Sequence, residues 1–452
     1  MSFSSRAAID TSQKRFGPFW LMPRITRVNA LTYFTAGFFG IALLAFLSFV
    51  QPLALRLAGV ERAIQGTVTG DLAFYQELLV LFMTPFIGAA ADKFGRRPLL
   101  MAGYFFLAIG YGLYPYADSI AMLYVYRFFF ACGVAHIATI IVIVSTDYVQ
   151  EGSRGKWVAF ASFTQGIGVL LFSQLVRWIP ARLEIQGFTE VDIAKVLFWG
   201  AMGICVFTFA LMRVGLSPHK PPEARERDSF AQLMAAGLRA GRDNARIALG
   251  YGTAFAARGD VLVVGLFLFL WTQHAAEDLG LSMGDAFRRG GMLMAVIQGS
   301  ALIWALCLSA FLDRIDRVTG VVIAFTLSAI GYTSFGLIGN PFDNAAIIPG
   351  ILLGMGETST IIAGNALMGQ SAPTAIRGAV LGMFSLSGAA GILLATLLGG
   401  RLFDNWMPGG PYVQMGVINS VILIWAIYVR FNSRATAPVT PPTTADTSDA
   451  SA

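Results

Sequence analysis

Six ionisable side chains interrupt long apolar runs of this sequence. Insertion of a charged group into a bilayer costs about 2.5–3.5 kcal/mol on translocon scales, so such residues mark candidate functional sites. A carboxyl or an imidazole can take up and release a proton there, and a guanidinium can bind an anionic group. The candidate residues are Glu77, Arg127, His136, Arg258, Asp260 and Glu357.

The residue types leave more than one interpretation for each position. Arg258 and Asp260 are two positions apart, about 200° around a helix, so we expect them to face different partners. Arg258 is either a substrate or coupling residue or one half of a structural ion pair. Glu357 is either a proton carrier or a partner in an interhelical hydrogen bond, and His136 is either a titrating group or a packed histidine. Glu77 matches no motif and is expected nearer the outside.

The elements that must position these residues are membrane helices. The chain is 56% hydrophobic and 13% charged, with a mean hydropathy of +0.65, whereas soluble proteins carry about 25% charged residues. A helix needs about 20 mainly apolar residues to cross a hydrocarbon core. We predict an all-α integral membrane protein that crosses the bilayer about twelve times, at 29–55, 67–91, 98–117, 119–146, 157–176, 193–212, 247–272, 291–312, 318–339, 345–370, 378–400 and 411–429.

The distribution of basic residues predicts the orientation of the chain. The first apolar run starts near Asn29 and lacks a cleavage signature, which indicates a retained span with residues 1–28 in the cytoplasm. Most of the 32 Lys and Arg residues then fall in cytoplasmic segments, as the positive-inside rule requires. We expect both termini in the cytoplasm, with the protein surrounded by lipids of the inner membrane. Because the bases are spread over many short loops, the pI of about 9.3 does not indicate a nucleic-acid partner.

A polar interval divides the chain into two halves with six predicted spans each. The predicted domains cover 29–214 and 247–432, joined by a cytoplasmic loop over 215–246 and followed by a disordered cytoplasmic tail over 433–452. Within the loop, Phe230, Leu233, Met234 and Leu238 repeat at helical spacing, which predicts a short amphipathic helix on the cytoplasmic surface. Either this helix is a plain linker, or it has a regulatory or lipid-sensing role.

The two halves are also related in sequence. A shift of about 223 positions places Arg154 on Arg377 and the stretch G-V-L-L at 168–171 on G-I-L-L at 391–394. Agreement across several loops and spans indicates two related bundles. Their orientations are predicted to be parallel, because each half crosses the membrane an even number of times.

The densest charged segment reads G-A-A-A-D-K-F-G-R-R and lies between the second and third predicted spans. It resembles the loop signature of the major facilitator superfamily, and a degenerate copy follows the eighth predicted span. The resemblance implies two pseudo-symmetric six-helix bundles that move a solute by alternating access. The residues of the motif are Gly88, Asp92, Lys93, Gly95, Arg96 and Arg97 in the first copy and Asp313, Arg314 and Arg317 in the second.

The position of this motif at cytoplasmic helix ends predicts a gating role. Gly88 would permit a close backbone approach, and Gly95 a tight turn. Asp92 is expected to meet cations or helix N-termini of the other half in one conformation and to lose them in another. The basic residues could instead serve only to fix the topology. The expected partners on the same face are Asp147, Glu151, Arg154 and Arg377.

The fourth predicted span contains a second family pattern. The stretch R-F-F-F-A-C-G at 127–133 resembles the R-x-x-x-G-x-G signature of proton-coupled members, with Ala131 in place of the first glycine. This resemblance implies that Arg127 takes part in proton coupling. The signatures of drug antiporters, sugar porters and peptide symporters are missing from the corresponding segments, so the sequence indicates no subfamily.

These features predict a proton-coupled secondary transporter, either a symporter or an antiporter, for a small organic solute. The two arginines within spans favour an anion or a zwitterion. The alternative is efflux of amphipathic drugs or lipids, which the 36 Phe and 16 Met residues would suit. We expect a monomer with no cofactor, no metal, no enzymatic motif and no phosphate-binding loop for ATP. The three cysteines, Cys132, Cys205 and Cys307, are expected to be free and buried.

Overall fold

The structure, a computed structural model, describes residues 13–218, 230–312 and 314–433. Within these residues, 12 helices are long and apolar enough to cross a membrane, and each lies where the hydrophobic pattern predicts a span. The first half contains α1 (Arg27–Leu57), α2 (Gln65–Phe94), α3 (Arg96–Leu113), α4 (Ile120–Asp147), α5 (Glu151–Ile185) and α6 (Glu190–Gly215). The second half contains α8 (Ala245–Asp278), α9 (Met283–Leu312), α10 (Arg317–Gly336), α11 (Ile347–Ser371), α12 (Arg377–Asn405) and α13 (Gly410–Ser433).

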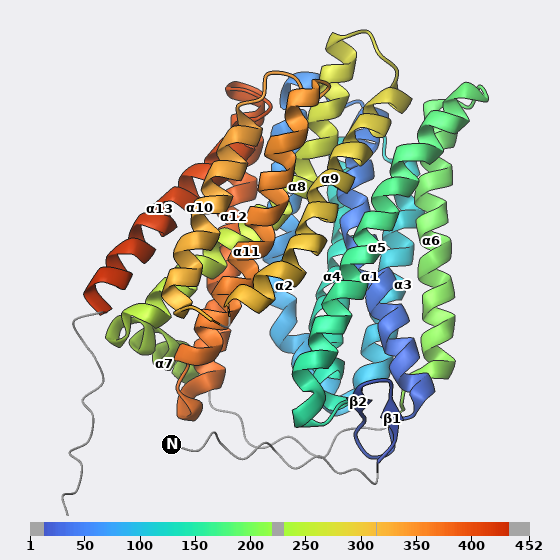
Figure 1. Cartoon of the computed structure of the whole chain (residues 1–452). Helices are drawn as coiled ribbons and strands as arrows, with labels where there is room; N and C mark the ends of the chain where they lie inside the picture. The colour runs from blue at the N-terminus through green and yellow to red at the C-terminus, as the bar shows by residue number, and fades with distance from the viewer. Residues whose placement is uncertain (1–12, 219–229, 313, 434–452) are drawn as a thin grey trace, which may run out of the picture.

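The helices form two bundles that stand side by side, α1–α6 and α8–α13 (Figure 1). We call the face that carries the start of α1 and the end of α13 the terminal face. The opposite face carries the turns at Gly187 and Gly280, which both have positive φ, and we call it the distal face. The predicted fold class, twelve membrane helices in two pseudo-symmetric six-helix bundles, is confirmed.

Close helix contacts in the bundles depend on glycines. A Cβ atom on Gly391 of α12 would collide with the carbonyl oxygen of Phe255 on α8, and one on Gly409 would collide with the backbone of Gly336. Apolar side chains gain nothing by leaving lipid for another apolar surface, so membrane helices associate largely through close backbone approach at small residues. These glycines therefore set the distances between helix axes.

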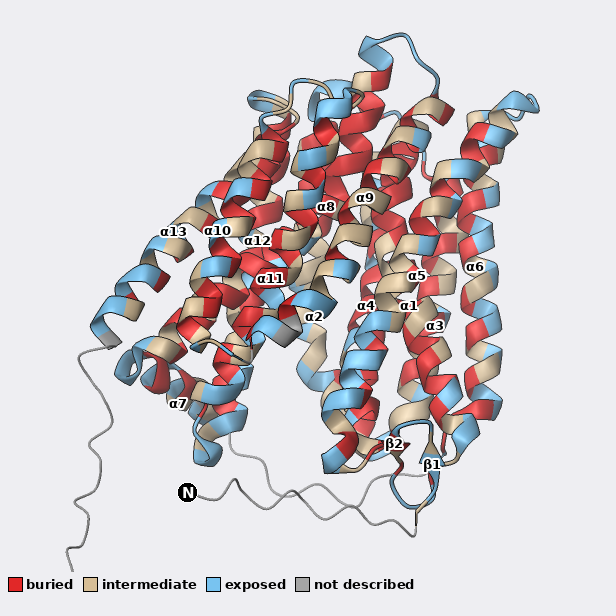
Figure 2. Ribbon diagram, in the orientation of Figure 1, coloured by how far each residue is buried: buried red, intermediate tan, exposed pale blue. Residues whose placement is uncertain are grey.

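Two seams join the bundles at the distal face. In one, Gly70 of α2 lies against the backbone of Thr396 on α12, and in the other Gly291 of α9 lies against Ser173 on α5. Residues 65–73 of α2 are mostly buried, whereas residues 78–94 are mostly exposed or half-buried (Figure 2). The ribbons of the two bundles diverge toward the terminal face (Figure 1). The molecule is therefore closed at its distal face.

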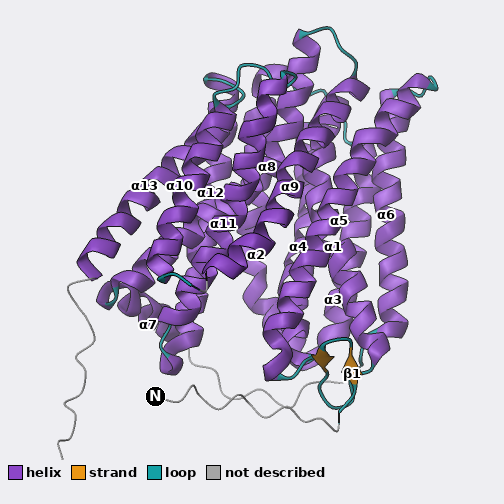
Figure 3. Ribbon diagram, viewed as in Figure 1, coloured by secondary structure: helices purple, strands orange, loops and turns teal. Residues whose placement is uncertain are grey.

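A short hairpin precedes the first membrane helix. It consists of β1 (Arg15–Phe16) and β2 (Phe19–Trp20), an antiparallel pair at the terminal face (Figure 3). The ring of Phe19 lies 5.3 Å from that of Trp157 on α5 and 6.1 Å from that of Phe34 on α1. This aromatic contact ties the starts of α1 and α5 together, and the sequence analysis did not anticipate it.

Tyr148, directly after α4, joins three segments of the first bundle at the same face. Its carbonyl accepts a hydrogen bond from the backbone of Met22 at 3.0 Å, and its hydroxyl accepts one from the backbone of Ser217 at 3.1 Å. Burial raises the pKa of Tyr148 to about 12, so the hydroxyl stays protonated near neutral pH. Tyr148 therefore holds the segment before α1 and the end of α6 against the end of α4.

The predicted amphipathic helix in the central loop is present as α7 (Phe230–Asp243), but it packs through a different face. Gly237 lies against Ala379 and Met383 of α12, and Ala240 belongs to a buried apolar cluster. Leu238, which the sequence assigns to the apolar face, is 55% exposed. Small residues form the contact with α12 because they allow the two helices to approach most closely. The side chain of Phe230 lies outside the described residues.

The expectation for the cysteines is partly wrong. Cys132 and Cys205 are free and buried, whereas Cys307 on α9 is free but exposed. In a soluble protein an apolar helix position usually points inward, but in a membrane helix the outer surface meets lipid and is equally apolar. Membership of a span therefore does not predict burial.

Overpacking of the α8–α12 contact tests the glycine argument. Gly391→Ala is expected to lower the free energy of unfolding by about 1–3 kcal/mol, because the added methyl group meets the backbone of Phe255. Gly382→Ala on the same helix is the matched control, because a Cβ there meets nothing within 4 Å. Thermal unfolding in detergent measures both variants. Equal melting temperatures for the two would contradict the assigned role of Gly391.

Candidate functional site

Two opposite charges from the two bundles lie near one another inside the membrane. Arg258 of α8 is exposed although it lies well within a span, and Glu77 of α2 is half-buried. The two side chains are within electrostatic range of each other. Glu77 is therefore nearer the middle of the membrane than the sequence analysis expects, because its span begins at Arg62 rather than near residue 67.

The exposure of Arg258 has a local cause. Its Cγ lies over Gly388 of α12, where a Cβ atom would come within 2.6 Å of it. The glycine lets the arginine stem pass across α12, and the guanidinium then reaches the space beyond. The guanidinium is thus kept out of the packed interior of its own bundle, within electrostatic range of Glu77.

Asp260 and Glu357 form a second site, buried inside the C-terminal bundle. Asp260 of α8 is 0% exposed, and Glu357 of α11 is 5% exposed. The Asp260 carboxyl accepts a hydrogen bond from Nδ2 of Asn419 at 2.8 Å and one from Oγ of Ser328 at 3.3 Å. Asp260 and Glu357 are close enough to interact electrostatically. Four helices thus supply one polar cluster around two carboxyl groups.

Neutral polar groups complete the surroundings of Glu357. The amide of Gln298 on α9 lies beside its carboxyl, and its Oε2 atom makes no hydrogen bond to any described residue. The hydroxyls of Tyr332 and Tyr412, both fully enclosed, are near enough to the carboxyl to sense its charge. No arginine or lysine of the described residues forms an ion pair with Asp260 or Glu357. The cluster therefore has acids and hydrogen-bonding groups but no counterion.

Arg127 lies in the N-terminal bundle and is 2% exposed. Its Nε donates to the carbonyl of Leu72 on α2 at 3.4 Å, and its guanidinium lies 5.7 Å from the ring centre of Phe130. Tyr114 is a further neighbour. Among the described residues no carboxylate forms an ion pair with Arg127, and its buried Nη1 makes no hydrogen bond to any of them.

His136 is also buried in the N-terminal bundle. Its Nδ1 lies 2.8 Å from the carbonyl oxygen of Cys132, one turn earlier, and its ring lies 5.7 Å from that of Phe106 on α3. These contacts fit a packed histidine. The structure thus groups Glu77 with Arg258 and Asp260 with Glu357, and it places Arg127 and His136 in surroundings of their own.

The charged motif at the terminal face forms a compact ionic group. Arg96 bridges two acids, with Nη1 2.8 Å from Oδ1 of Asp92 and Nε 3.0 Å from Oδ2 of Asp147. Gly95 makes the expected turn with a φ of 94°. Gly88 differs from the expectation, because a Cβ there would meet nothing within 4 Å. The other bundle does not approach Gly88 while the two bundles diverge at this face.

The remaining motif residues lie within their own halves. The described contacts are a cation–π approach of Lys93 to Phe94 at 5.4 Å, an ion pair of Arg154 with Glu151 at 3.3 Å, a bond from Arg377 to the carbonyl of Gly369 at 3.3 Å and one from Arg317 to that of Leu312 at 2.8 Å. Arg97 lies near Tyr148, and Arg314 is exposed. Asp313 lies outside the described residues.

The sequence analysis missed the polar residues that join the halves at the distal face. They sit at the ends of spans, where charged residues are expected on topological grounds alone, so no local pattern distinguishes them. Bonds between the halves include those of Arg56 with Glu277 at 3.2 Å, Arg62 with Asp278 at 2.6 Å, Arg401 with Asp71 at 2.9 Å and Gln65 with His274 at 2.9 Å, together with those of Glu184 and Asp404.

Comparison with known proteins gives a family. The model of the Major Facilitator Superfamily matches residues 28–349 and 253–451. The magnetosome protein MamH of Paramagnetospirillum magneticum is 27% identical over 391 residues, which cover 84% of this chain and 87% of that protein. The magnetosome protein MamZ of the same organism is 23% identical over 86% of this chain, and the match spans 61% of MamZ.

Solved structures show the same fold. The nucleoside transporter NupG superposes with a TM-score of 0.67 at 14% identity, over 89% of this chain and 98% of NupG. The inward-open xylose transporter XylE from E. coli superposes with a TM-score of 0.66 at 16% identity, over 88% of this chain and 95% of XylE. Since the family model covers most of the sequence, this chain belongs to the major facilitator superfamily of membrane transporters.

Proposed function

We propose that this protein is a secondary active transporter for a small organic solute and that Arg258 and Glu77 line its path. The observation that carries this proposal is an exposed arginine well inside a span, opposite an acid from the other bundle. The bundles over 29–214 and 247–432 would rock about this site and expose it to each side in turn. The protein would act as a monomer, because one chain supplies both charges.

The charges of the site favour an anionic or zwitterionic solute. A carboxylate or phosphate of the solute can bind the Arg258 guanidinium in a bidentate fashion and replace its interaction with Glu77. A solute that also carries an ammonium group can bind Glu77 at the same time. For a zwitterion, this exchange of partners keeps an opposite charge near both Arg258 and Glu77 before and after binding, so solute binding does not carry the full cost of desolvation.

We propose that transport is coupled to protons through Asp260 and Glu357. Two carboxyl groups in a cluster without a counterion repel each other when both are ionised, which favours a bound proton. The free Oε2 atom of Glu357 supports its role as the carrier, whereas the two hydrogen bonds to Asp260 support a positioning role. Arg127, by its resemblance to the family signature, is proposed as a second coupling residue.

The motif at the terminal face is proposed as a gate. The described ion pairs of Arg96 with Asp92 and Asp147 lie within one half in this distally closed state, and the motif is proposed to contact the other half when the terminal face closes. By the positive-inside rule the terminal face is assigned to the cytoplasm, with the chain in the inner membrane. The names of MamH and MamZ make a magnetosome membrane a second location, which imaging of a fluorescent fusion distinguishes.

Thermal stabilisation by ligands tests the solute class. At a ligand concentration 100 times the dissociation constant, binding stabilises the folded state by about 2.7 kcal/mol. We expect organic anions or zwitterions to raise the melting temperature of the wild type, and Arg258→Ala to abolish the shift. Arg182→Ala, at an exposed arginine of the distal face, is the control. Stabilisation by lipophilic cations or lysolipids alone would favour efflux of amphipathic compounds instead.

Substitution of the proposed proton carrier tests the coupling. Glu357→Gln keeps the shape and the contact with Gln298 but removes the proton site. The variant is expected to exchange solute across proteoliposomes at nearly the wild-type rate and to lose acceleration by a pH gradient. Glu61→Gln, at an exposed acid of the distal face, should behave as the wild type. Wild-type acceleration in Glu357→Gln would remove this residue from the proton path.

Neutralisation of the motif acid tests the gate. Asp92→Asn weakens the ion pair with Arg96 while keeping the side-chain volume, and it is expected to abolish transport at an unchanged level of expression. Asp243→Asn is the control, because Asp243 is an exposed acid at the end of α7 on the same face and belongs to neither copy of the motif nor to its expected partners. Wild-type transport by Asp92→Asn would contradict a gating role and leave the motif a topological one.

A further inference from the structure

Two acids at the distal face cap helices that belong to the opposite bundle. At the end of α12, the carboxylate of Asp404 accepts two backbone hydrogen bonds from the start of α2. Its Oδ1 lies 2.8 Å from the nitrogen of Gly66, and its Oδ2 lies 2.6 Å from that of Thr67. The first backbone N–H groups of a helix have no partner within the helix, so a carboxylate from elsewhere can satisfy them.

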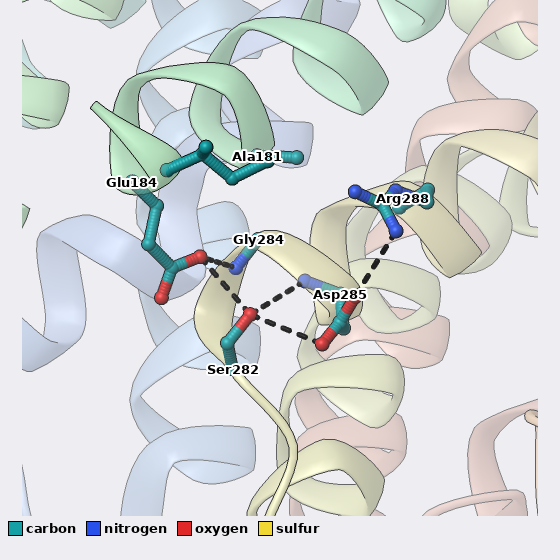
Figure 4. A pocket seen from close by; sticks show the side chains of 7 residues that line it. Ala181, Glu184, Ser282, Gly284, Asp285 and Arg288 are labelled. Atoms are coloured by element: carbon teal, nitrogen blue, oxygen red, sulfur yellow. Dashed lines mark hydrogen bonds and ion pairs between the residues drawn. The ribbon is translucent and has the colours of Figure 1, made fainter. Parts of the chain in front are cut away.

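Glu184 at the end of α5 makes the corresponding contact with the start of α9. Its Oε2 accepts a hydrogen bond from the nitrogen of Gly284 at 2.7 Å and one from Oγ of Ser282 at 3.0 Å (Figure 4). Ser282 also bonds to Asp285 of its own helix. The contact borders a cavity of about 350 Å³ that includes Arg288. An acid of the N-terminal bundle thus caps a helix of the C-terminal bundle.

The two caps are related by the internal symmetry of the fold. The helices α5 and α12 are the fifth of their bundles, and α2 and α9 are the second. Each acid lies at the last turn of a fifth helix and binds the backbone of a second helix across the seam. Asp404 and Glu184 are separated in sequence by nearly the shift that relates the two halves. One ancestral contact, present twice, is the simplest account of this correspondence.

A glycine occupies the same place in both capped helices. Gly66 and Gly284 are each the second residue of their helix. A Cβ atom on Gly66 would collide with Asp404 and Phe403, and one on Gly284 would collide with Glu184 and Ala181. Any larger residue would push the carboxylate away from the helix start. The glycines are therefore part of the contact and not incidental to it.

We propose that Asp404 and Glu184 act as two matched locks that hold the distal face closed and that both must release before the central site opens to that side. Each lock joins the two bundles, so it exists only while the fifth and second helices touch at their distal ends. Charge-assisted hydrogen bonds to a helix start are among the stronger polar contacts available at a partly exposed surface. The proposal rests on alternating access but not on the identity of the solute.

The ion pairs near the two locks contribute less to holding the distal face closed. Arg56 with Glu277 and Arg401 with Asp71 also join the halves, but their side chains are about a third to a half exposed. Exposed ion pairs are screened by salt and contribute little. The backbone N–H groups of the capped helices are fixed in place, so the locks lose less side-chain entropy than a pair of long side chains does.

Distances across the distal face measure the state of the locks. Spin labels at Phe188→Cys and Leu281→Cys lie on opposite bundles at exposed positions outside both locks. They are introduced with Cys307→Ser, because Cys307 is exposed whereas Cys132 and Cys205 are buried. Double electron–electron resonance in lipid nanodiscs then reports the populations with the distal face closed and open, without any solute.

Removal of the caps is expected to open the distal face. Glu184→Ala and Asp404→Ala should each raise the ratio of open to closed molecules by about tenfold, and the double variant should combine the two effects because the sites do not touch. A second label pair at Thr146→Cys and Thr374→Cys on the terminal face should report shorter distances in the same variants. An unchanged distal distance in the double variant would overturn the proposal.

Two further variants separate the locks from general damage. Gly66→Ala with Gly284→Ala keeps both acids but displaces them, so it should shift the distances in the same direction. Asp192→Ala is the matched control, because Asp192 contacts Thr189 of its own bundle at the same face. An equal shift in this control would show that any lost acid opens the face, and it would contradict specific locks. If the spin-label distances change as expected but no solute raises the melting temperature of the wild type, the proposed function is contradicted and the locks are not.

Discussion

The contact between the bundles at the distal face is the interaction on which the rest of the structure depends. The helices α2 and α12 approach there because Gly70 lies against the backbone of Thr396, and α9 reaches α5 through Gly291. Bulky apolar side chains elsewhere on these helices keep the axes apart, and lipid offers them an equally good environment. The bundles therefore meet at one end and diverge at the other, and Arg258 is exposed within its span.

The two halves differ in the groups that surround their buried ionisable residues. In the C-terminal bundle, Asp260 and Glu357 are enclosed with neutral groups such as Asn419, and no cation of the described residues forms an ion pair with them. In the N-terminal bundle, Arg127 is enclosed beside a backbone carbonyl and aromatic rings. The two bundles therefore place acids in one buried cluster and an arginine in another.

The sequence predicts the features that depend only on the order of residues along the chain. Twelve spans follow from apolar run lengths, and the repeat and the charged motif identify the two related bundles, because none of these requires knowledge of contacts. The sequence does not predict that Asp260 lies near Glu357 or that Glu77 faces Arg258, since each pair joins helices far apart in the chain. Exposure within spans is equally out of reach, as Cys307 shows, because lipid and protein interior are both apolar.

Alternating access requires that the contacts closing the distal face and those closing the terminal face have similar free energies. A face closed by more than a few kcal/mol over its alternative would leave the other state almost unpopulated, and a solute of modest affinity could not reverse it. Carboxylates on helix starts, as at Gly66 and Gly284, and an arginine between two acids, as at Arg96, are both contacts of moderate energy at partly exposed surfaces. Both sets are present in this distally closed structure, and under the proposed gate the motif would gain contacts with the other half as the distal contacts break, so that the difference between the states would stay small while each state remains defined.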